Sequence, residues 1–258
     1  MTYKNIHEAY LDALQQVWYF PEFQASPRGM PIREILNYTF TISDPVAEPI
    51  VTKDLERNKV IAAYTAKEME LYNSRSNHVE DFAKASKFWE KIANPDGTIN
   101  SAYGYLIWEN KSCGNENYEY TKKHSFEDGG ISIRARPIYR SPWEWAKQSL
   151  IQDKDTRQAI LRFSLPEHQW MGNKDQTCTM HGNFLIRNDK LYFSVVMRSG
   201  DLVKGAAYDW PWFVHLMDRM VEELKPTYPN LTKGTYTHTT HSLHIYEKDE
   251  ETILKMLG

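Results

Sequence analysis

The chain has 258 residues, which fits one large domain or two small ones, and its 41% hydrophobic and 25% charged residues are typical of a soluble globular protein. The formal net charge is −3 and no basic block occurs, which argues against binding to polymeric nucleic acid. A single nucleotide is compatible with this charge, because one phosphate needs only a few well-placed arginines.

The cysteine content and hydropathy indicate a cytoplasmic protein. The two cysteines, Cys113 and Cys178, are too few for a disulfide framework in a chain of this length. The first residues lack the apolar core of a signal peptide, and no run of about 18 apolar residues occurs. We therefore expect a reduced protein that makes no membrane contact.

The first predicted elements are two helices separated by a loop. Residues 6–18 carry apolar side chains at helical spacing. The stretch PEFQASPRGMP is rich in Pro and Gly, so we expect Arg28 in a loop before the first long strand. A second helix is predicted over residues 54–72, and Glu68 falls on its apolar stripe.

The rest of the chain alternates helices and strands irregularly. The predicted elements are a helix at 87–92, a turn at 94–97, a helix at 145–152, a strand at 159–163, a hairpin over 183–199 around RNDK, a helix from about Asp209, and a last strand, TYTHTTHSLHIY. Because no regular βαβ rhythm occurs, the predicted fold is α+β with a mixed β-sheet packed by helices. No linker stands out, so residues 1–258 are expected to form a single domain.

Cys178 is the first candidate for chemistry. It lies in QTCTMHGNF, before the strand of the hairpin. A cysteine is more often a small packing residue than a nucleophile, and a thiol becomes reactive where a cation or amide donors lower its pKa. Arg198, at the far end of the hairpin, is a suitable cation. Cys113 lies in the loop NKSCGNEN, where we expect an unreactive thiol.

The run MRSGDLVKGAAYD holds several candidate ligands. Arg198 and Ser199 leave a strand and enter a loop, where a guanidinium and a hydroxyl can bind a phosphate, and Asp201 follows them. A salt bridge within the loop explains the same residues without any ligand. The residues alone leave both interpretations open.

Glu68 also permits two interpretations. Burying a carboxylate without a partner is costly, and the usual response is a raised pKa, which suits proton transfer at neutral pH. A salt bridge to a residue elsewhere in the fold explains the same position without a catalytic role.

The histidines of the last strand do not predict a metal site. Side chains alternate along a strand, so His238 and His244 share one face while His241 points to the other. Tyr246 shares the face of His244, and both side chains are of a kind that contacts a sugar hydroxyl. The sequence contains no P-loop and no dinucleotide-binding glycine fingerprint.

Several motifs together carry a family resemblance. The matching runs, in chain order, are EMELYNSRS, FWEKIANPDGTINSAYG, DKDTR, the stretch around Cys178, RSGDLVKGAAYD and SLHIY. Each is weak alone, but the ordered set covers nearly the whole chain. The chain resembles the folate-dependent thymidylate synthase superfamily, and most closely its bacteriophage deoxycytidylate (dCMP) hydroxymethylases. The resemblance implies a thymidylate synthase-like fold with one sheet face at a homodimer interface.

The resemblance also implies a role for each matched residue. Cys178 matches the nucleophile that adds to carbon 6 of a pyrimidine, and Glu68 matches the carboxylate that organises water and proton transfers. Arg28, Arg198 and Ser199 match phosphate ligands, and Arg157 matches an arginine that the other subunit donates to the phosphate. His244 and Tyr246 match the ligands of the sugar 3′-hydroxyl, and Asn183 replaces a Gln that is common beside the base. Trp89, Tyr103 and Asp201 match positions of the folate site.

Asp209 is expected to select the base. Family members that act on uracil carry Asn at this position, because an amide donates to the 4-oxo group and accepts from the ring N–H. Cytosine offers an exocyclic amine instead, which a carboxylate accepts. Asp is also a common helix N-cap, which explains an acidic residue here without excluding contact with a base. We predict cytosine recognition by Asp209.

The chain departs from the synthase pattern at other positions. Gln158 stands where a second phosphate arginine is usual, and Ile92 replaces a Trp found in the synthases. The sequence ends shortly after Tyr246, where synthases continue into a tail that covers the site. Ile92 and the short tail are expected to favour water over hydride at the reaction centre.

The resemblance implies a dCMP 5-hydroxymethyltransferase. Cys178 adds to carbon 6, carbon 5 takes the one-carbon unit of 5,10-methylenetetrahydrofolate, and water completes 5-hydroxymethyl-dCMP. The expected setting is a homodimer in the cytoplasm, that of the host if a DNA-modifying phage encodes it. The alternatives are a dCMP 5-methyltransferase, a dUMP-directed enzyme of the thymidylate synthase type, and a non-catalytic nucleotide-binding homologue.

Overall fold

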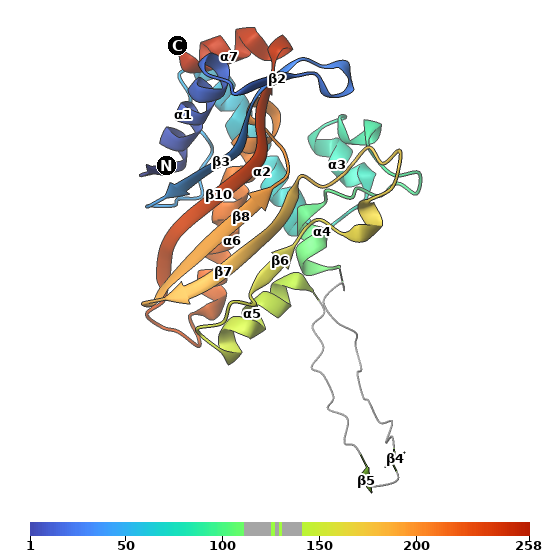
Figure 1. Ribbon diagram of the computed structural model, residues 1–258, viewed down its shortest axis with the longest axis vertical. Helices are drawn as coiled ribbons and strands as arrows, with labels where there is room; N and C mark the ends of the chain where they lie inside the picture. Colours follow the sequence, from blue (N-terminus) through green and yellow to red (C-terminus); the bar gives the residue numbers. More distant parts are fainter. Residues whose placement is uncertain (111–124, 127–128, 131–140) are drawn as a thin grey trace.

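The computed structural model describes residues 1–110, 125–126, 129–130 and 141–258 (Figure 1). Cys113 lies outside these ranges. Within them, no helix is both long and apolar enough to cross a membrane.

A mixed sheet forms the centre of the structure. Its strand order is β1-β3-β10-β8-β7-β6, with β2 paired to β3 and β9 paired to β10. The long strand β10 runs antiparallel to β3 and parallel to β8, which makes the sheet mixed. The strands are β1 (Thr2–Tyr3), β2 (Phe23–Ala25), β3 (Ile32–Ile42), β6 (Ile160–Arg162), β7 (Thr179–Arg187), β8 (Lys190–Met197), β9 (Gly200–Asp201) and β10 (Thr232–Tyr246); β4 (Ser125–Phe126) and β5 (Gly129–Gly130) form a separate pair.

Helices pack on one face of this sheet. The helices are α1 (Ile6–Tyr19), α2 (Leu55–Ser74), α3 (Val79–Ala85), α4 (Tyr103–Trp108), α5 (Pro142–Gln152), α6 (Ala207–Leu224) and α7 (Glu250–Leu257). In Figure 1, α2 and α6 lie behind the sheet. The buried side of α6 includes Trp210 and Phe213, whose ring centroids lie 5.5 Å and 6.0 Å from that of His238 on β10. Trp212 packs on Tyr72 of α2, with 5.0 Å between ring centroids. Burial of these aromatic side chains stabilises the packing of α6 on the sheet and on α2.

Among the described residues, no helix covers the other face of the sheet (Figure 1), and threonine pairs line part of it. Thr39 pairs with Thr239 across β3 and β10, with 3.0 Å between their hydroxyl oxygens, and Thr41 pairs with Thr237 at 3.1 Å. Such threonine pairs stabilise neighbouring strands without an apolar layer above them. The homodimer interface expected on a sheet face remains a prediction.

Most predicted elements are confirmed, and the α+β fold with a mixed sheet is correct. The helix predicted at 87–92 is wrong: only the short 3-10 turn Trp89–Lys91 forms there. A helix occurs instead at α3, which the sequence did not reveal because Phe82 is its only buried residue. The first strand of the hairpin starts at Thr179, four residues earlier than the predicted range.

Candidate active site

The hairpin of β7 and β8 brings Cys178 to Arg198. Thr179 pairs with Met197 in the ladder, so the residues just outside the two strands are neighbours. The Arg198 amide donates to the Cys178 carbonyl at 2.9 Å, and the Arg198 Nη2 lies 3.6 Å from the Cys178 Sγ. The expected proximity of thiol and guanidinium is therefore present.

Burial dominates the chemistry of this thiol. It raises the pKa of Cys178 to about 11, although the charge of Arg198 acts in the opposite direction. The guanidinium is itself held in place, because its Nε donates to the Thr177 carbonyl at 3.1 Å and its Nη2 donates to the Gln176 carbonyl. In this state the thiol is protonated at neutral pH, so its attack on a substrate requires a proton acceptor.

Glu68 of α2 is buried near this thiol, with 8% of its surface exposed. The Tyr72 hydroxyl donates to its Oε1 at 3.2 Å. Burial and, to a smaller extent, the nearby carboxyl of Asp209 together raise the pKa of Glu68 to about 8. Among the described residues no salt bridge to Glu68 is present, so the salt-bridge interpretation is not supported, and the role of Glu68 in proton transfer remains a prediction.

Asp209 projects from the first turn of α6. Burial raises its pKa to about 7, with a further contribution from Asp201. The helix begins at Ala207 after a π-helical turn, and Ala206 holds the N-cap position, so the N-cap explanation of Asp209 is wrong. A Cβ on Gly205 would lie 3.3 Å from the Asp209 Oδ2, which explains why a glycine precedes this helix.

The charge of Asp209 acts on Glu68. Both carboxyls are poorly hydrated, and Asp209 disfavours ionisation of Glu68, so Glu68 retains its proton near neutral pH. A group of this kind both accepts and releases protons at neutral pH. The arrangement fits acid–base chemistry on a small polar ring bound beside Cys178.

Tyr103 completes the cluster. Its ring stacks on Tyr72 with 5.2 Å between centroids, and its pKa is raised by burial and by Asp209, Cys178 and Glu68. The helix that carries it approaches α2 closely, since a Cβ on Gly104 would meet the Tyr72 carbonyl oxygen at 1.7 Å. We call Glu68, Tyr103, Cys178 and Asp209 the acid–thiol cluster.

Asp201 and His244 lie side by side because β9 pairs with β10 in that register. The Asp201 Oδ1 accepts from the backbone amides of Val203 at 2.8 Å and Lys204 at 3.1 Å, while no described residue donates to its Oδ2. The His244 Nδ1 faces the Ser242 carbonyl at 3.2 Å, and since a carbonyl only accepts, Nδ1 carries the proton. The His244 Nε2 is then an acceptor, suited to a hydroxyl.

A cationic rim surrounds Tyr246. Lys204 and Lys248 lie 5.5 Å and 4.9 Å from the centre of its ring, and the charge of Arg28 lowers the pKa of its hydroxyl against the larger effect of burial. Arg28 is exposed and has a left-handed backbone with φ of 54°. The lysines were not among the candidates from the sequence, although Lys248 follows Tyr246 by only two positions.

The remaining candidates occupy different places. Trp89 is buried against Phe82, with 5.0 Å between ring centroids, and Ser199 follows Arg198 at the end of β8. Arg157 is exposed and belongs to a segment that contacts the turn end of β7, where Arg187 donates to the Asp155 carbonyl. With nine residues, β7 is on the order of 25–30 Å long, so Arg157 does not reach the Cys178 of its own chain.

Asn183 is not brought to the acid–thiol cluster. It alternates along β7 with Gly182 and Phe184, which are buried towards the helices, so it points to the opposite face of the sheet. Its Oδ1 is buried without a hydrogen-bond partner among the described residues. On β10 the buried positions alternate only as far as Thr240, so His238 is buried and His241 exposed as predicted. Leu243, His244 and Ile245 are then buried in succession, so the prediction that His244 shares the face of His238 is not confirmed.

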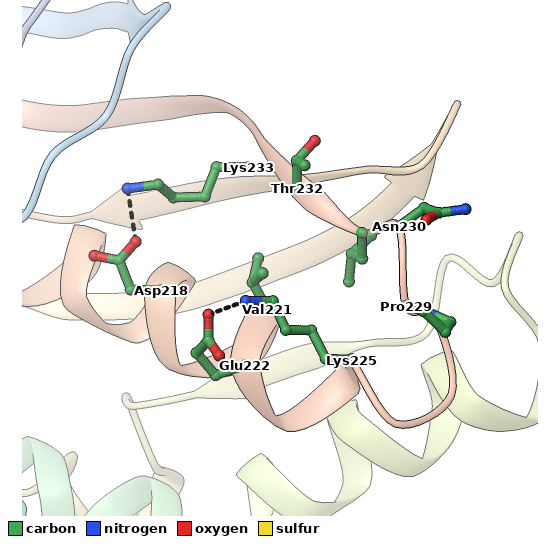
Figure 2. Close-up of a pocket in the computed structure, with 9 residues that line it drawn as sticks. Asp218, Val221, Glu222, Lys225, Pro229, Asn230, Thr232 and Lys233 are labelled. Carbon is green, nitrogen blue, oxygen red and sulfur yellow. Dashed lines mark hydrogen bonds and ion pairs between the residues drawn. The ribbon is translucent and has the colours of Figure 1, made fainter.

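A separate surface pocket lies at the end of α6 (Figure 2). Its charged side chains pair with one another, Lys233 with Asp218 at 2.6 Å and Lys225 with Glu222 at 2.5 Å. Because these charges are neutralised within the surface, the acid–thiol cluster is the better candidate for chemistry.

Comparison with known proteins agrees with this geometry. The thymidylate synthase family model matches residues 8–258. Deoxycytidylate 5-hydroxymethyltransferase of Enterobacteria phage T6 is 26% identical over 234 residues, which cover 88% of this chain and 80% of that protein, and the phage T4 protein gives the same values. Deoxyuridylate hydroxymethyltransferase of Bacillus phage SP01 is 26% identical over 246 residues, covering 94% of this chain and 57% of that protein.

The buried Glu68 predicts a pH-dependent gain in stability for Glu68→Gln. The folded protein binds the Glu68 proton more tightly than the unfolded chain, so the wild type loses stability as pH rises from about 4.5 through about 8. The neutral variant avoids this loss, and above pH 8 its free energy of unfolding should exceed that of the wild type by on the order of 3 kcal/mol. Urea denaturation between about pH 5 and 9 measures the difference.

Glu70→Gln is the matched control. Glu70 is exposed on the same helix, where water solvates its charge, so this variant should show no gain that grows with pH. A stability difference for Glu68→Gln that stays constant across the range would contradict the burial of an ionisable Glu68.

Proposed function

Because the chain belongs to the thymidylate synthase family, we propose that it transfers a one-carbon unit from 5,10-methylenetetrahydrofolate to carbon 5 of dCMP, with water completing 5-hydroxymethyl-dCMP. The observation that carries this proposal is the acidic Asp209 in the acid–thiol cluster, where burial raises its pKa to about 7. The phage relatives named for deoxycytidylate hydroxymethylation support the same substrate.

Asp209 supports cytosine as the base. A carboxylate accepts from the exocyclic amine of cytosine, and Asp209 is the carboxyl that the acid–thiol cluster offers for this contact. An ionised carboxyl offers no donor to the 4-oxo group of uracil. In a buried site such a mismatch is strongly rejected.

The polar groups around the cluster suit the rest of the nucleotide. Arg198, Ser199 and Arg28 bind the phosphate as charge-assisted donors. His244 contacts the 3′-hydroxyl through its Nε2, and Tyr246 lies beside it with 5.4 Å between ring centroids. The cationic rim favours the approach of an anionic nucleotide.

Arg157 enters the proposal as a residue of a second subunit. It is exposed at the far end of β7 from its own Cys178, so it serves only the site of a partner. The uncovered polar face of the sheet suits the homodimer that such donation requires. Gln158 stands where a second phosphate-binding arginine is usual, so Arg157 is the one arginine of this pair that a partner subunit can donate to the phosphate.

The folate has a fitting place beside the cluster. Asp201 uses only Oδ1 for its backbone contacts, so Oδ2 is available to the N–H donors of a pterin. Trp89 and Tyr103 provide aromatic surface on the α2 and α4 side of the site. When bound, 5,10-methylenetetrahydrofolate supplies a carbon at the oxidation level of formaldehyde.

The residues of the chain then act on the nucleotide. Cys178 loses its proton to an acceptor in the site, and its sulfur bonds to carbon 6, which makes carbon 5 nucleophilic. Carbon 5 bonds to the one-carbon unit and loses its own proton, and the bond between that unit and the folate nitrogen breaks, which leaves an exocyclic methylene on the ring. Glu68 and Asp209 exchange these protons and orient the water whose oxygen bonds to the new carbon. Cleavage of the sulfur–carbon bond releases 5-hydroxymethyl-dCMP, with tetrahydrofolate as the other product.

Hydration rather than reduction is supported by the relatives and by the site. The phage proteins from T6, T4 and SP01 are all named as hydroxymethyltransferases. Ile92, partly buried against the core, takes the place of a synthase tryptophan. The SP01 relative, named for deoxyuridylate, makes dUMP the second candidate substrate, and Asp209 argues against it. We place the reaction in the cytoplasm of a host whose phage modifies DNA cytosines.

Product analysis with dCMP, CMP and dUMP tests the proposal. We expect tetrahydrofolate and a hydroxymethylated nucleotide with dCMP, and little turnover with the other two nucleotides. Mass spectrometry identifies the nucleotide, and absorbance detects any dihydrofolate. Dihydrofolate with a methylated nucleotide would reject hydration, and preferential turnover of dUMP would reject cytosine recognition.

Asp209→Asn tests the base contact separately. The amide should lower kcat/KM for dCMP by about 100-fold and shift preference towards dUMP, because the donor–acceptor pattern at the base changes. Asp218→Asn is the control, since Asp218 lies on the same helix but pairs with Lys233 at the surface. An unchanged preference for dCMP in Asp209→Asn would remove this residue from base selection.

Mixed dimers test the donated arginine. Arg157→Ala and Cys178→Ala should each be nearly inactive alone, because every site lacks one essential group. After subunit exchange, half of the dimers are mixed and each has one complete site, so about a quarter of wild-type activity should return. Native mass spectrometry confirms the exchange, and absence of activity in confirmed mixed dimers would argue against donation across the interface.

A further inference from the structure

The segment that leads to Cys178 makes a ladder of side-chain hydrogen bonds with the turn before α4. The members on the nucleophile side are Asn173, Asp175, Thr177 and Thr179, and those on the turn side are Asn100, Ser101 and Tyr103. The four residues of the first group are spaced by two, so in an extended segment they share one side. We call this set of contacts the polar ladder.

Asp175 is the central member of the polar ladder. Its Oδ2 accepts from the Ser101 amide at 2.9 Å, its Oδ1 accepts from the Ser101 hydroxyl, and its carbonyl accepts from the Asn100 side chain at 3.1 Å. Only 5% of its surface is exposed, and burial raises its pKa while the bonds from Ser101 lower it. A buried carboxyl that meets two donors of one residue holds that residue firmly.

The polar ladder ends at the acid–thiol cluster. The Thr179 hydroxyl donates to the Tyr103 hydroxyl oxygen at 2.8 Å, and both side chains are buried. Because the oxygen of Tyr103 accepts this bond, its own hydrogen is left for another acceptor. Ser101 lies two residues before Tyr103, and Asp175 lies three residues before Cys178.

Arg198 holds the same segment through its backbone, since its Nε donates to the Thr177 carbonyl at 3.1 Å. Gln176 offers its carbonyl to the guanidinium, and the Cys178 Sγ lies 3.6 Å from it. The segment is therefore held from two sides, by Arg198 on one and by the polar ladder on the other. A shift of the ladder would move the thiol relative to Tyr103.

We propose that Asp175 is a positioning residue, which through Ser101 sets the distance between the Cys178 thiol and the Tyr103 hydroxyl so that both address the same pyrimidine ring. The role of that ring rests on the proposed function. Misplacement by about 1 Å is known to cost about 100-fold in rate, so a rigid link between the two segments has a direct catalytic value. Asp175 itself does not touch the substrate.

Asp175→Ala removes both acceptors for Ser101. We expect the dissociation constant for dCMP, measured by calorimetry, to stay within about threefold while tritium release from carbon 5 of labelled dCMP falls about 100-fold. Asp175→Asn keeps an oxygen for the Ser101 amide and should recover most of the rate. The matched control is Asp96→Ala: the Asp96 Oδ1 accepts from the Thr98 amide at 3.0 Å and its hydroxyl at 2.6 Å, but within a surface turn.

The outcomes separate positioning from simple stability. Normal tritium release by Asp175→Ala, or a loss of binding equal to the loss of rate, would overturn the proposal. If Asp175→Ala does not fold, the isosteric Thr179→Val removes the donor to Tyr103 and should lower tritium release about tenfold with dCMP binding intact. An unchanged rate in Thr179→Val would equally overturn it.

Tritium release by the wild type is measured first, and it shows whether the proposed function fails. If the wild type turns over dUMP instead of dCMP, the same variants are compared on dUMP, and the prediction for Asp175 is unchanged. A wild type that releases no tritium from either nucleotide rejects the proposed function and, with it, a catalytic value for the polar ladder.

Discussion

The shared burial of two carboxyl groups, Glu68 on α2 and Asp209 on α6, is the constraint on which the site depends. Water would hydrate each charge, but in the interior desolvation and the charge of a neighbouring carboxyl, Asp209 for Glu68 and Asp201 for Asp209, raise both pKa values to between about 7 and 8. This arrangement costs stability, and the contacts between α2, α6 and the sheet offset that cost. Proton transfer at neutral pH is the chemistry that such a pair supports.

The fold positions the other reactive groups with backbone pairing. The β7–β8 register sets Cys178 beside Arg198, and the β9–β10 register sets Asp201 beside His244. Close approach of Gly104 to the backbone of Tyr72 lets the Tyr103 ring stack on that of Tyr72, whose hydroxyl donates to Glu68. Groups held by strands and packed helices vary little in position, which suits a reaction that needs a thiol, two acids and a water around one ring.

Sequence patterns predicted the long elements and the contacts that follow from pairing. The hairpin explains why Cys178 and Arg198 could be placed together, since its ends must meet. The apolar stripe of α2 likewise placed Glu68 in the interior. Local sequence patterns say little about short elements, and for this reason the helix α3 was not predicted. They say equally little about contacts between distant loops, so the polar ladder was not predicted either. Asn183 was misplaced because a motif match does not show which face of a strand a residue occupies.

The most direct measurement is the mass of a trapped covalent complex. A fluorine at carbon 5 cannot leave as a proton, so 5-fluoro-dCMP with 5,10-methylenetetrahydrofolate should halt the reaction with the nucleotide bonded to the protein. We expect intact-protein mass spectrometry to show protein, nucleotide and folate joined, and peptide mapping to place the bond at Cys178. The same adduct should form poorly with 5-fluoro-dUMP. A bond at another residue, or preferential trapping by 5-fluoro-dUMP, would contradict a cytosine-directed site built on Cys178 and Asp209.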